Sequence, residues 1–197
     1  METTLISTVY DVEPVMICIT KFSPKKVMLL TEDDASDVMK ESEKTLSNAF
    51  GRFINIKSHQ ADSKDLVKVA DSIAQAIEKE KNQGNKIVVN ISGGEKPHAL
   101  GTLYGAYAKH QFVDRIVFVD DYSKDVIDIP ILKYGISPTK KEVLKCLING
   151  CSSIKELSSE IKISRGMTYN HVRELRDMGL IEKETLEITT AGKLAVV

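Results

Sequence analysis

The sequence predicts an α/β fold: a Rossmann-like, mostly parallel sheet with helices on both faces, followed by a winged helix-turn-helix domain. Over the first 135 residues, short β-rich runs alternate with segments of helical periodicity, which is the pattern of a parallel sheet. Two of the runs, residues 88–91 and 116–119, are almost entirely β-branched or aromatic, as strands buried on both faces are. After residue 135 helical segments dominate. We therefore assign residues 1–135 to the first domain and residues 136–197 to the second.

The first domain is expected to alternate strands and helices along its whole length. The predicted strands are Thr4–Tyr10, Lys26–Leu30, Phe53–Ser58, Lys86–Ile91 and Arg115–Val119, and the predicted helices are Glu13–Lys21, Ala35–Phe50, Ser63–Lys81 and Pro97–His110. A further run, Val126–Leu132, is expected to return as an edge strand, where Pro130 is tolerated. We expect the strand order 3-2-1-4-5, which reverses the winding direction beside the first and fourth strands.

The second domain is expected to begin at the linker Gly135–Pro138 and to contain three main helices. These helices run from Thr139 to about Ile148, from Ser153 to about Ile161 and from Arg165 to Met178. The first two open with capping-box spacing, a Thr or Ser followed three residues later by Glu, and Gly179 ends the third. Two short strands across Leu180–Ile188 and a closing helical turn at Thr190–Ala195 complete the winged-helix order.

Composition excludes several classes of protein. Apolar residues make up 42% and charged residues 28% of the chain, which is typical of a globular protein. No apolar run approaches the roughly 18 residues of a membrane helix, and the N-terminus lacks the basic region of a signal peptide, so we expect a cytoplasmic protein with no membrane contact. Cys18, Cys146 and Cys151 form no CxxC pair, which predicts reduced, buried thiols and neither a disulfide nor a zinc site.

The third helix of the second domain has the residue types of a DNA-reading helix. Its predicted inner stripe is Thr168, Val172 and Leu175, and its predicted outward residues are Arg165, Met167, Tyr169, Asn170 and Arg173. Arg, Asn and apolar side chains can contact base edges, and Ser164 is expected to cap the helix beside a phosphate. From Thr139 onward there are ten Lys or Arg against eight Asp or Glu, a mild excess that agrees with this role. A winged helix used only for protein contacts remains the alternative.

The fourth strand of the first domain ends in a loop suited to an anion. In the segment Asn90–Pro97, Gly93 and Gly94 let the backbone approach a ligand and leave amides free, and Lys96 adds a cation at the start of a helix. Pro97 suits the first helical turn. Neither a Walker motif nor a dinucleotide fingerprint is present. The alternative is a simple tight turn between strand and helix.

Two further features could contribute to a site. His98 lies in the first turn of that helix and could contact a ligand. Asp120 and Asp121 end the fifth strand and could bind Mg²⁺, although a solvated turn is favoured for them.

The second domain resembles a known class. The segment Ser153–Glu184, and above all its ending RELRDMGLIEKE, is similar to the winged-helix domains of many bacterial and archaeal transcription regulators. The resemblance covers about sixty residues and implies a fold and a DNA-binding role, but it does not specify an operator.

The whole chain resembles the CARF-domain regulators associated with CRISPR systems, on the strength of its domain order and the motif NISGGEK at residues 90–96. The resemblance implies a cyclic oligoadenylate bound across a homodimer two-fold axis. Its implied contacts are the loop after the first strand, Ser7, Thr8, Val9, Tyr10 and Asp11, and the residues Asn90, Ser92, Gly93, Gly94, Glu95, Lys96 and His98. Glu95 departs from the commoner motif, so its carboxylate is expected to point away from the phosphates or to cap the helix.

These observations together predict a homodimeric transcription regulator. It would sense cyclic oligoadenylate, with the tetra-adenylate as the favoured ring, bind double-stranded promoter DNA and act on CRISPR-associated genes in antiviral defence, without a cofactor. Two alternatives remain open. One is a metal-independent ring nuclease, in which Lys96 stabilises the transition state and a ribose 2′-hydroxyl is the nucleophile. The other is a regulator that senses another nucleotide or a small anion.

Overall fold

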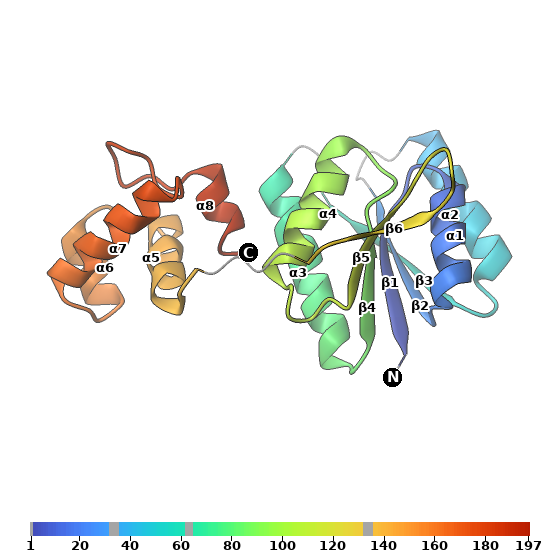
Figure 1. The fold of residues 1–197 in the computed structure, drawn as a ribbon, viewed down its shortest axis with the longest axis horizontal. Helices are drawn as coiled ribbons and strands as arrows, with labels where there is room; N and C mark the ends of the chain where they lie inside the picture. The colour runs from blue at the N-terminus through green and yellow to red at the C-terminus, as the bar shows by residue number, and fades with distance from the viewer. Residues whose placement is uncertain (1, 32–35, 62–64, 132–135) are drawn as a thin grey trace. The chain divides into compact units, whose positions relative to one another are not determined.

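The computed structural model describes residues 2–31, 36–61, 65–131 and 136–197. Spatial contacts divide the chain into two compact units, Met1–Lys133 and Tyr134–Val197 (Figure 1). The start of the expected linker, Gly135, lies outside the described residues. Each unit is described by itself below.

The first unit is built on a six-stranded sheet with the order β3-β2-β1-β4-β5-β6. Its strands are β1 (Thr3–Thr8), β2 (Lys26–Thr31), β3 (Asn55–Gln60), β4 (Lys86–Asn90), β5 (Arg115–Val119) and β6 (Val126–Ile129). All neighbouring pairs are parallel except β5 and β6, which are antiparallel. The predicted strand order and the edge position of the last strand are confirmed. That strand is shorter than expected because it ends before Pro130, which has no amide hydrogen for the ladder.

Two helices cover each face of the sheet (Figure 1). They are α1 (Val12–Phe22), α2 (Asp37–Phe50), α3 (Leu66–Asn82) and α4 (Lys96–Ala108). Side chains of a strand alternate between the two faces, so the sheet has two cores. One core packs strand residues such as Ile6 and Ile87 against α3 and α4, and the other packs Leu5 and Leu29 against α1 and α2.

Side-chain caps correct several predicted boundaries. The first strand ends at Thr8, and not at Tyr10 as expected, because Asp11 caps the next helix three residues later. An Asp11 carboxylate oxygen accepts a hydrogen bond from the Val12 amide at 2.6 Å. The second and third helices begin after the caps Ser36 and Asp65, which are later than the expected starts at residues 35 and 63; those two positions lie outside the described residues.

Glycines bring α3 and α4 into close contact. A Cβ atom at Gly105 would lie 2.5 Å from the carbonyl oxygen of Ala70 and 2.9 Å from the Cβ of Ile73, both on α3. A Cβ atom at Gly101 would likewise lie 2.5 Å from the Cγ1 atom of Val69 on α3. The small residues of α4 therefore serve helix packing inside this unit.

The second unit consists of α5 (Pro138–Ile148), α6 (Ile154–Glu160), α7 (Arg165–Asp177) and α8 (Thr190–Leu194), which pack around one core. Ser153 caps α6 as predicted. The capping box predicted at Thr139 is wrong, because α5 begins earlier: Ser137 is the cap, and its hydroxyl accepts a hydrogen bond from the Lys140 amide at 3.4 Å. Pro138 occupies the first helical position, where its missing amide hydrogen does not matter.

The wing is a loop, and the two strands predicted across Leu180–Ile188 are not formed. Among the described residues of the wing, the only β-bridge joins Ile181 to Ile188. Arg176 of α7 holds the loop between them: its Nε donates to the carbonyl oxygen of Glu182 at 3.1 Å and its Nη2 to that of Thr185 at 2.9 Å. The loop is mostly exposed and charged, so it has no apolar face to favour longer strands.

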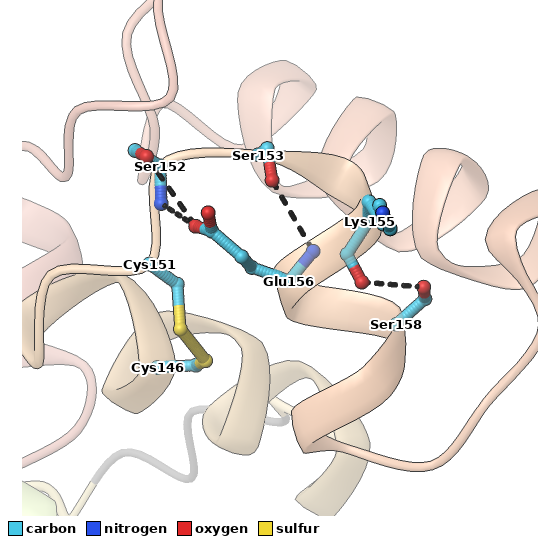
Figure 2. The surroundings of a disulfide bond; sticks show 7 residues. All are labelled: Cys146, Cys151, Ser152, Ser153, Lys155, Glu156 and Ser158. Carbon is cyan, nitrogen blue, oxygen red and sulfur yellow. Dashed lines mark hydrogen bonds between the residues drawn. A yellow bond between two sulfur atoms is a disulfide. The ribbon is translucent and has the colours of Figure 1, made fainter.

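A disulfide joins Cys146 of α5 to Cys151, just before α6 (Figure 2). The expectation of three reduced thiols is therefore wrong for this pair. The Cα atoms lie 5.5 Å apart because Gly150, at φ 96°, turns the chain back directly after α5. Cys18 stays a free, buried thiol, and burial raises its pKa to about 12.

Gly105→Ala is expected to destabilise the first unit by about 1–3 kcal/mol, because the new methyl group collides with the backbone of α3. Gly166→Ala is the control: it lies in α7 with no atom near its position and should stabilise its helix by about 0.5–1 kcal/mol. Urea unfolding followed by circular dichroism measures both changes. An unchanged or raised midpoint for Gly105→Ala would contradict the described helix packing.

Alkylation of the cysteines tests the pairing. In denaturant without reductant, mass spectrometry should detect one alkylated thiol, Cys18, and three after reduction. In the folded protein near neutral pH Cys18 should stay unmodified, because its raised pKa keeps the thiol protonated well above that pH. Alkylation of Cys146 and Cys151 without reductant would show that the two thiols are not joined.

Candidate functional site

The first candidate site lies where β1 and β4 end side by side. The two strands are parallel, with Ser7 opposite Asn90. From β1 the chain continues into α1 on one face of the sheet, and from β4 into α4 on the other, so the winding direction switches between them. The loops diverge at such a point and leave a crevice, which is where ligands bind in open α/β sheets.

Asn90 fixes the loop after β4. Its buried side-chain amide donates to the Ser7 hydroxyl at 2.9 Å, and its Oδ1 accepts hydrogen bonds from the amide and the hydroxyl of Ser92. The Ser92 hydroxyl in turn accepts from the Val119 amide at 2.7 Å. One buried side chain therefore connects the ends of β1, β4 and β5.

The two glycines have different roles. The Gly93 amide donates to the Thr8 hydroxyl at 3.1 Å, and a Cβ there would lie 3.0 Å from both the Thr8 carbonyl oxygen and the Tyr10 nitrogen. The expectation that both glycine amides are free is therefore wrong for Gly93, which seals the loop against β1. Gly94 adopts φ 81°, a conformation that favours glycine, and turns the chain into α4.

The amino end of α4 carries uncompensated positive charge. No hydrogen bond to another group of the described residues involves the amides of Gly94, Glu95 or Lys96. The Lys96 side chain is exposed and has no ion-pair partner in the described part of the chain. Glu95 is the N-cap residue, but its exposed side chain makes no capping hydrogen bond. Of the two roles expected for its carboxylate, capping of the helix is therefore not observed, and neither Glu95 nor Lys96 lines the neighbouring cavity.

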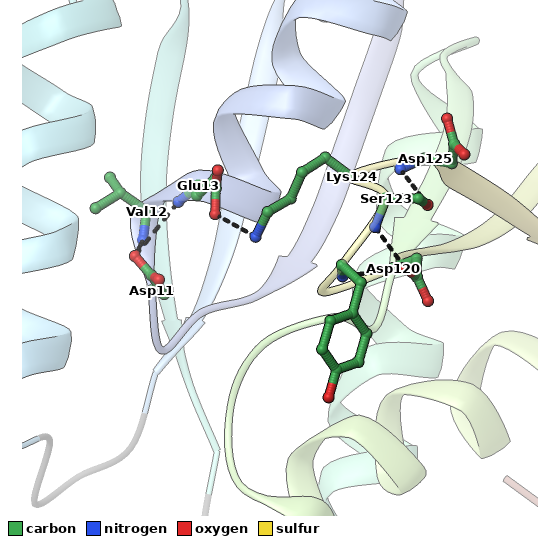
Figure 3. Close-up of polar contacts among 8 residues, drawn as sticks. Asp11, Val12, Glu13, Asp120, Ser123, Lys124 and Asp125 are labelled. Atoms are coloured by element: carbon green, nitrogen blue, oxygen red, sulfur yellow. Dashed lines mark hydrogen bonds and ion pairs between the residues drawn. The ribbon is translucent and has the colours of Figure 1, made fainter.

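A cavity of about 200 Å³ opens beside this loop and is acidic. Figure 3 shows three of its acidic side chains, Asp11, Glu13 and Asp120. It is lined by Tyr10, Asp11, Glu13, Pro14, Ile17, Ser92, Gly93, Gly94, Val119, Asp120, Asp121 and Lys124. Lys124 is the only cation among the described residues that line it, and it pairs with Glu13 at 2.7 Å. Hydrogen bonds from the amides of Ser123 and Tyr122 lower the pKa of Asp120, which stays ionised. A phosphate is therefore unfavourable inside the cavity and favourable at the start of α4.

Several of the predicted contact residues are buried beneath the loop and support it. Ser7, Thr8, Val9, Asn90 and His98 are fully buried, whereas Tyr10 and Asp11 are exposed. The Nε2 atom of His98 lies 3.2 Å from the carbonyl oxygen of Ala61, below the Gly94 turn.

The sequence analysis missed Glu13 and Lys124. The available signal was that β5 ends at the same edge as β1 and β4, which brings the turn after β5 to the cavity. Asp120 and Asp121 belong to that turn, and the described residues contain no group of three or more potential metal ligands.

The second candidate site is the outer face of α7. The predicted inner residues Thr168, Val172 and Leu175 are buried, which confirms the periodicity. The predicted outward residues are all exposed: Arg165, Met167, Tyr169, Asn170 and Arg173. Ser164 caps the helix as predicted, because its hydroxyl accepts a hydrogen bond from the Met167 amide at 3.3 Å.

The outer face of α7 presents two exposed arginines. Arg165 and Arg173 have no ion-pair partner within the described ranges, whereas Glu174 is neutralised by Lys140 at 2.9 Å, which lowers its pKa. The wing carries Glu182, Glu184 and Glu187 against Lys183, so it is acidic. An anionic partner such as DNA is therefore attracted to α7 more than to the wing.

These features define a DNA-binding regulator with an N-terminal Rossmann-like domain. The family model "Bacterial regulatory protein, arsR family" matches residues 137–183, which comprise the helix-turn-helix. The family model HFX_2341_N, which describes an N-terminal domain, matches residues 2–120. Because this second match covers more than half of the chain, the chain belongs to the HFX_2341_N family.

Three solved structures are similar. Csm6 from Enterococcus italicus, bound to cyclic hexa-2′-fluoro-hexa-dAMP, is 11% identical with a TM-score of 0.57, over 92% of this chain and 56% of its own. Protein VC1899 from Vibrio cholerae is 11% identical with a TM-score of 0.50, over 98% and 63%. Can2 from Sulfobacillus thermosulfidooxidans, in complex with cyclic tetra-adenylate, is 14% identical with a TM-score of 0.49, over 98% and 62%.

These similarities show the fold alone, and they confirm the expected resemblance to CARF-domain winged-helix regulators at the level of fold and domain order. The chain spans less than two thirds of the length of each of these proteins. A search of curated proteins found no match. Within the described residues, no helix is long and apolar enough to span a membrane.

Asn90→Ala is expected to destabilise the first unit by about 1–3 kcal/mol, because it leaves the buried Ser7 and the half-buried Ser92 without their partner. Asn82→Ala, at the exposed end of α3, is the matched control and should change stability little. Urea unfolding gives both values. Equal stability of the two variants would show that the network does not hold the loop.

Proposed function

We propose that this protein is a homodimeric transcription regulator that binds cyclic tetra-adenylate at the Gly93–Lys96 loop and promoter DNA through α7. The observation that carries the proposal is that no described residue accepts a hydrogen bond from the amides of Gly94, Glu95 or Lys96, which lie next to the Lys96 ammonium group. Amides and a cation at a helix start are a suitable site for a phosphodiester. Two copies of the loop, related by a dimer axis, would contact a ring of phosphodiesters from both sides.

The acidic cavity supports adenine as the base. A phosphate is repelled there, so the part of the ligand that enters must be neutral and rich in hydrogen-bond donors. The exocyclic amine of adenine is such a donor, and the carboxylates of Asp120 and Asp121 can accept from it. Tyr10 lies at the rim, half exposed, where its ring can stack on a base.

An exposed apolar strip beside the loop supports the homodimer. Leu100 and Tyr104 are one helical turn apart on α4, and their side chains are 49% and 38% exposed. Csm6, which has the same fold, was solved with a bound cyclic hexanucleotide analogue, and this supports the ligand class. CRISPR-associated genes are the proposed targets because the domain order and the motif at residues 90–96 resemble those of CARF-domain regulators.

The proposed switch is a change in dimer geometry. Two recognition helices read half-sites about 34–36 Å apart, so a small change in their spacing alters operator binding. A ligand shifts that equilibrium only by the difference in its affinity for the two states. Phosphodiesters that contact both loops at once would give the ligand a higher affinity for the dimer geometry in which the two loops lie at the matching distance.

Binding of cyclic tetra-adenylate should depend on Gly94 and Lys96. Gly94→Ala strains a residue at φ 81°, and Lys96→Gln removes a cation, so each should weaken binding by roughly tenfold or more in calorimetric titration. Lys40→Gln, on the exposed side of α2, is the charge-matched control. Retained affinity in Lys96→Gln with loss in Lys124→Gln would instead place the phosphates in the cavity. Product analysis of the titrated ligand separates binding from cleavage.

Promoter binding should depend on the two free arginines of α7. Arg165→Ala with Arg173→Ala should lower affinity about tenfold or more and flatten the dependence of log K on log salt, because phosphate or base contacts are lost. Lys40→Ala with Lys44→Ala on α2 is the control and should leave both quantities unchanged. Electrophoretic mobility shifts on the protein's own upstream DNA, over a range of salt, measure this. If the double-arginine variant binds this DNA with the same affinity and salt dependence as the unmodified protein, the result would favour a winged helix that binds only protein.

A further inference from the structure

The edge of the sheet opposite the Gly93–Lys96 loop contains a second, separate hollow. It lies where the strands begin, at the edge marked by the N-terminus in Figure 1. A cavity of about 440 Å³ is formed by the starts of β1 and β2, by β3 and by the end of α3. A second cavity of about 540 Å³ adjoins it, and the two share Glu2, Lys25 and Asn55.

The floor of this hollow is a fixed, neutral ion pair. Glu80 of α3 is fully buried and pairs with Lys26 at the start of β2. It also accepts hydrogen bonds from the Thr4 hydroxyl at 3.1 Å and the Asn85 amide at 3.2 Å. Burial by itself would raise the pKa of Glu80, but the bonds from Lys26, Thr4 and Asn85 lower it overall, so the carboxylate stays ionised and its charge is matched by Lys26.

The walls carry unmatched positive charge. Lys25, Lys57 and Lys79 come from the turn before β2, from β3 and from α3, and all three are exposed. None has an ion-pair partner among residues 2–31, 36–61, 65–131 and 136–197. Among the described residues of the lining, Glu2 is the only carboxylate besides the paired Glu80. Three lysines from distant parts of the sequence therefore converge on one hollow with little to compensate them.

The backbone around these lysines is held firmly. The Lys25 amide donates to the Thr3 carbonyl oxygen at 3.0 Å, and its own carbonyl oxygen accepts from the Asn55 amide at 3.0 Å. Lys57 lies within β3, paired in register with Met28. Lys79 lies in the last turns of α3. The fold thus fixes the backbone at each of the three lysines, although it does not fix their long side chains.

An exposed aromatic ring stands at the rim. Arg52 and Phe53, in the connection between α2 and β3, line the adjoining cavity beside Lys25. Phe53 is 80% exposed, so its ring is accessible to a ligand. A flat apolar ring next to a cluster of cations is the combination that recognises a base joined to phosphates: the base stacks on the ring and the phosphates contact the cations.

We propose that this hollow is a second nucleotide-binding site, in which a base stacks on Phe53 and phosphates contact Lys25, Lys57 and Lys79. The site is independent of the proposed function, because it lies at the opposite edge of the sheet and shares no lining residue with the cavity beside Gly93 and Gly94. The chemistry fits a free nucleoside triphosphate and the end of a short single-stranded oligonucleotide equally, so the test has an arm for each.

The test is calorimetric titration of the full chain with ATP, with inorganic triphosphate and with a linear tetra-adenylate. All titrations are repeated in a Gly94→Ala background, which disables the other proposed site. We expect ATP or the linear strand to bind with the same affinity in both backgrounds and more tightly than inorganic triphosphate. The tighter of the two nucleotide arms identifies the source of the ligand.

Variants divide the site into its two parts. Lys57→Gln with Lys79→Gln should weaken nucleotide binding about tenfold or more. Phe53→Leu should weaken binding of ATP or the strand about fivefold or more but leave inorganic triphosphate unchanged. Lys40→Gln with Lys44→Gln is the charge-matched control on exposed α2 positions, and circular dichroism confirms folding of each variant.

Two results would overturn the proposal. One is absence of binding by both nucleotides, or binding that the double lysine variant leaves unchanged. The other is equal affinity for ATP and inorganic triphosphate with no effect of Phe53→Leu, which would reduce the hollow to a site for anions without base recognition.

Discussion

The candidate ligand site depends on one buried side chain, Asn90, whose polar atoms must all find partners away from water. It bonds to Ser7 on one neighbouring strand and to Ser92, which bonds to Val119 on the other. Because a buried amide without these partners is unfavourable, the network fixes where β4 ends and how the chain turns. The turn then needs glycine twice: Gly93 for its close approach to β1 and Gly94 for its positive φ. The free amides at the start of α4 are the result.

In each unit, positive and negative groups lie on separate surfaces. In the first unit the amino end of α4 is positive and the cavity beside it is acidic, so a ligand with phosphates and amino groups has one preferred orientation. In the second unit α7 presents free arginines, while the wing, held in place by Arg176, is acidic. The position of the charges, and not the net charge of −1, therefore determines what each unit can bind.

Much of the fold could be predicted because it depends on short-range patterns. The strand order follows from strand–helix alternation, and the outer face of α7 follows from periodicity at Thr168, Val172 and Leu175. The ion pair of Glu13 with Lys124 was missed because 111 residues separate its partners, and only the strand order brings them to the same edge of the sheet. The disulfide was missed because its geometry depends on the turn at Gly150. Likewise, nothing local in the sequence shows that Thr8 occupies the Gly93 amide.

The central claim is that the amides at the start of α4 hold a phosphodiester. Amide chemical shifts of the protein, measured by nuclear magnetic resonance during titration with cyclic tetra-adenylate, test it most directly. The account predicts that the largest shifts occur at Gly94, Glu95 and Lys96, with a smaller shift at Gly93, whose amide is already bonded to Thr8. Saturating ligand that leaves these amides unmoved, or that shifts mainly residues elsewhere in the chain, would contradict it.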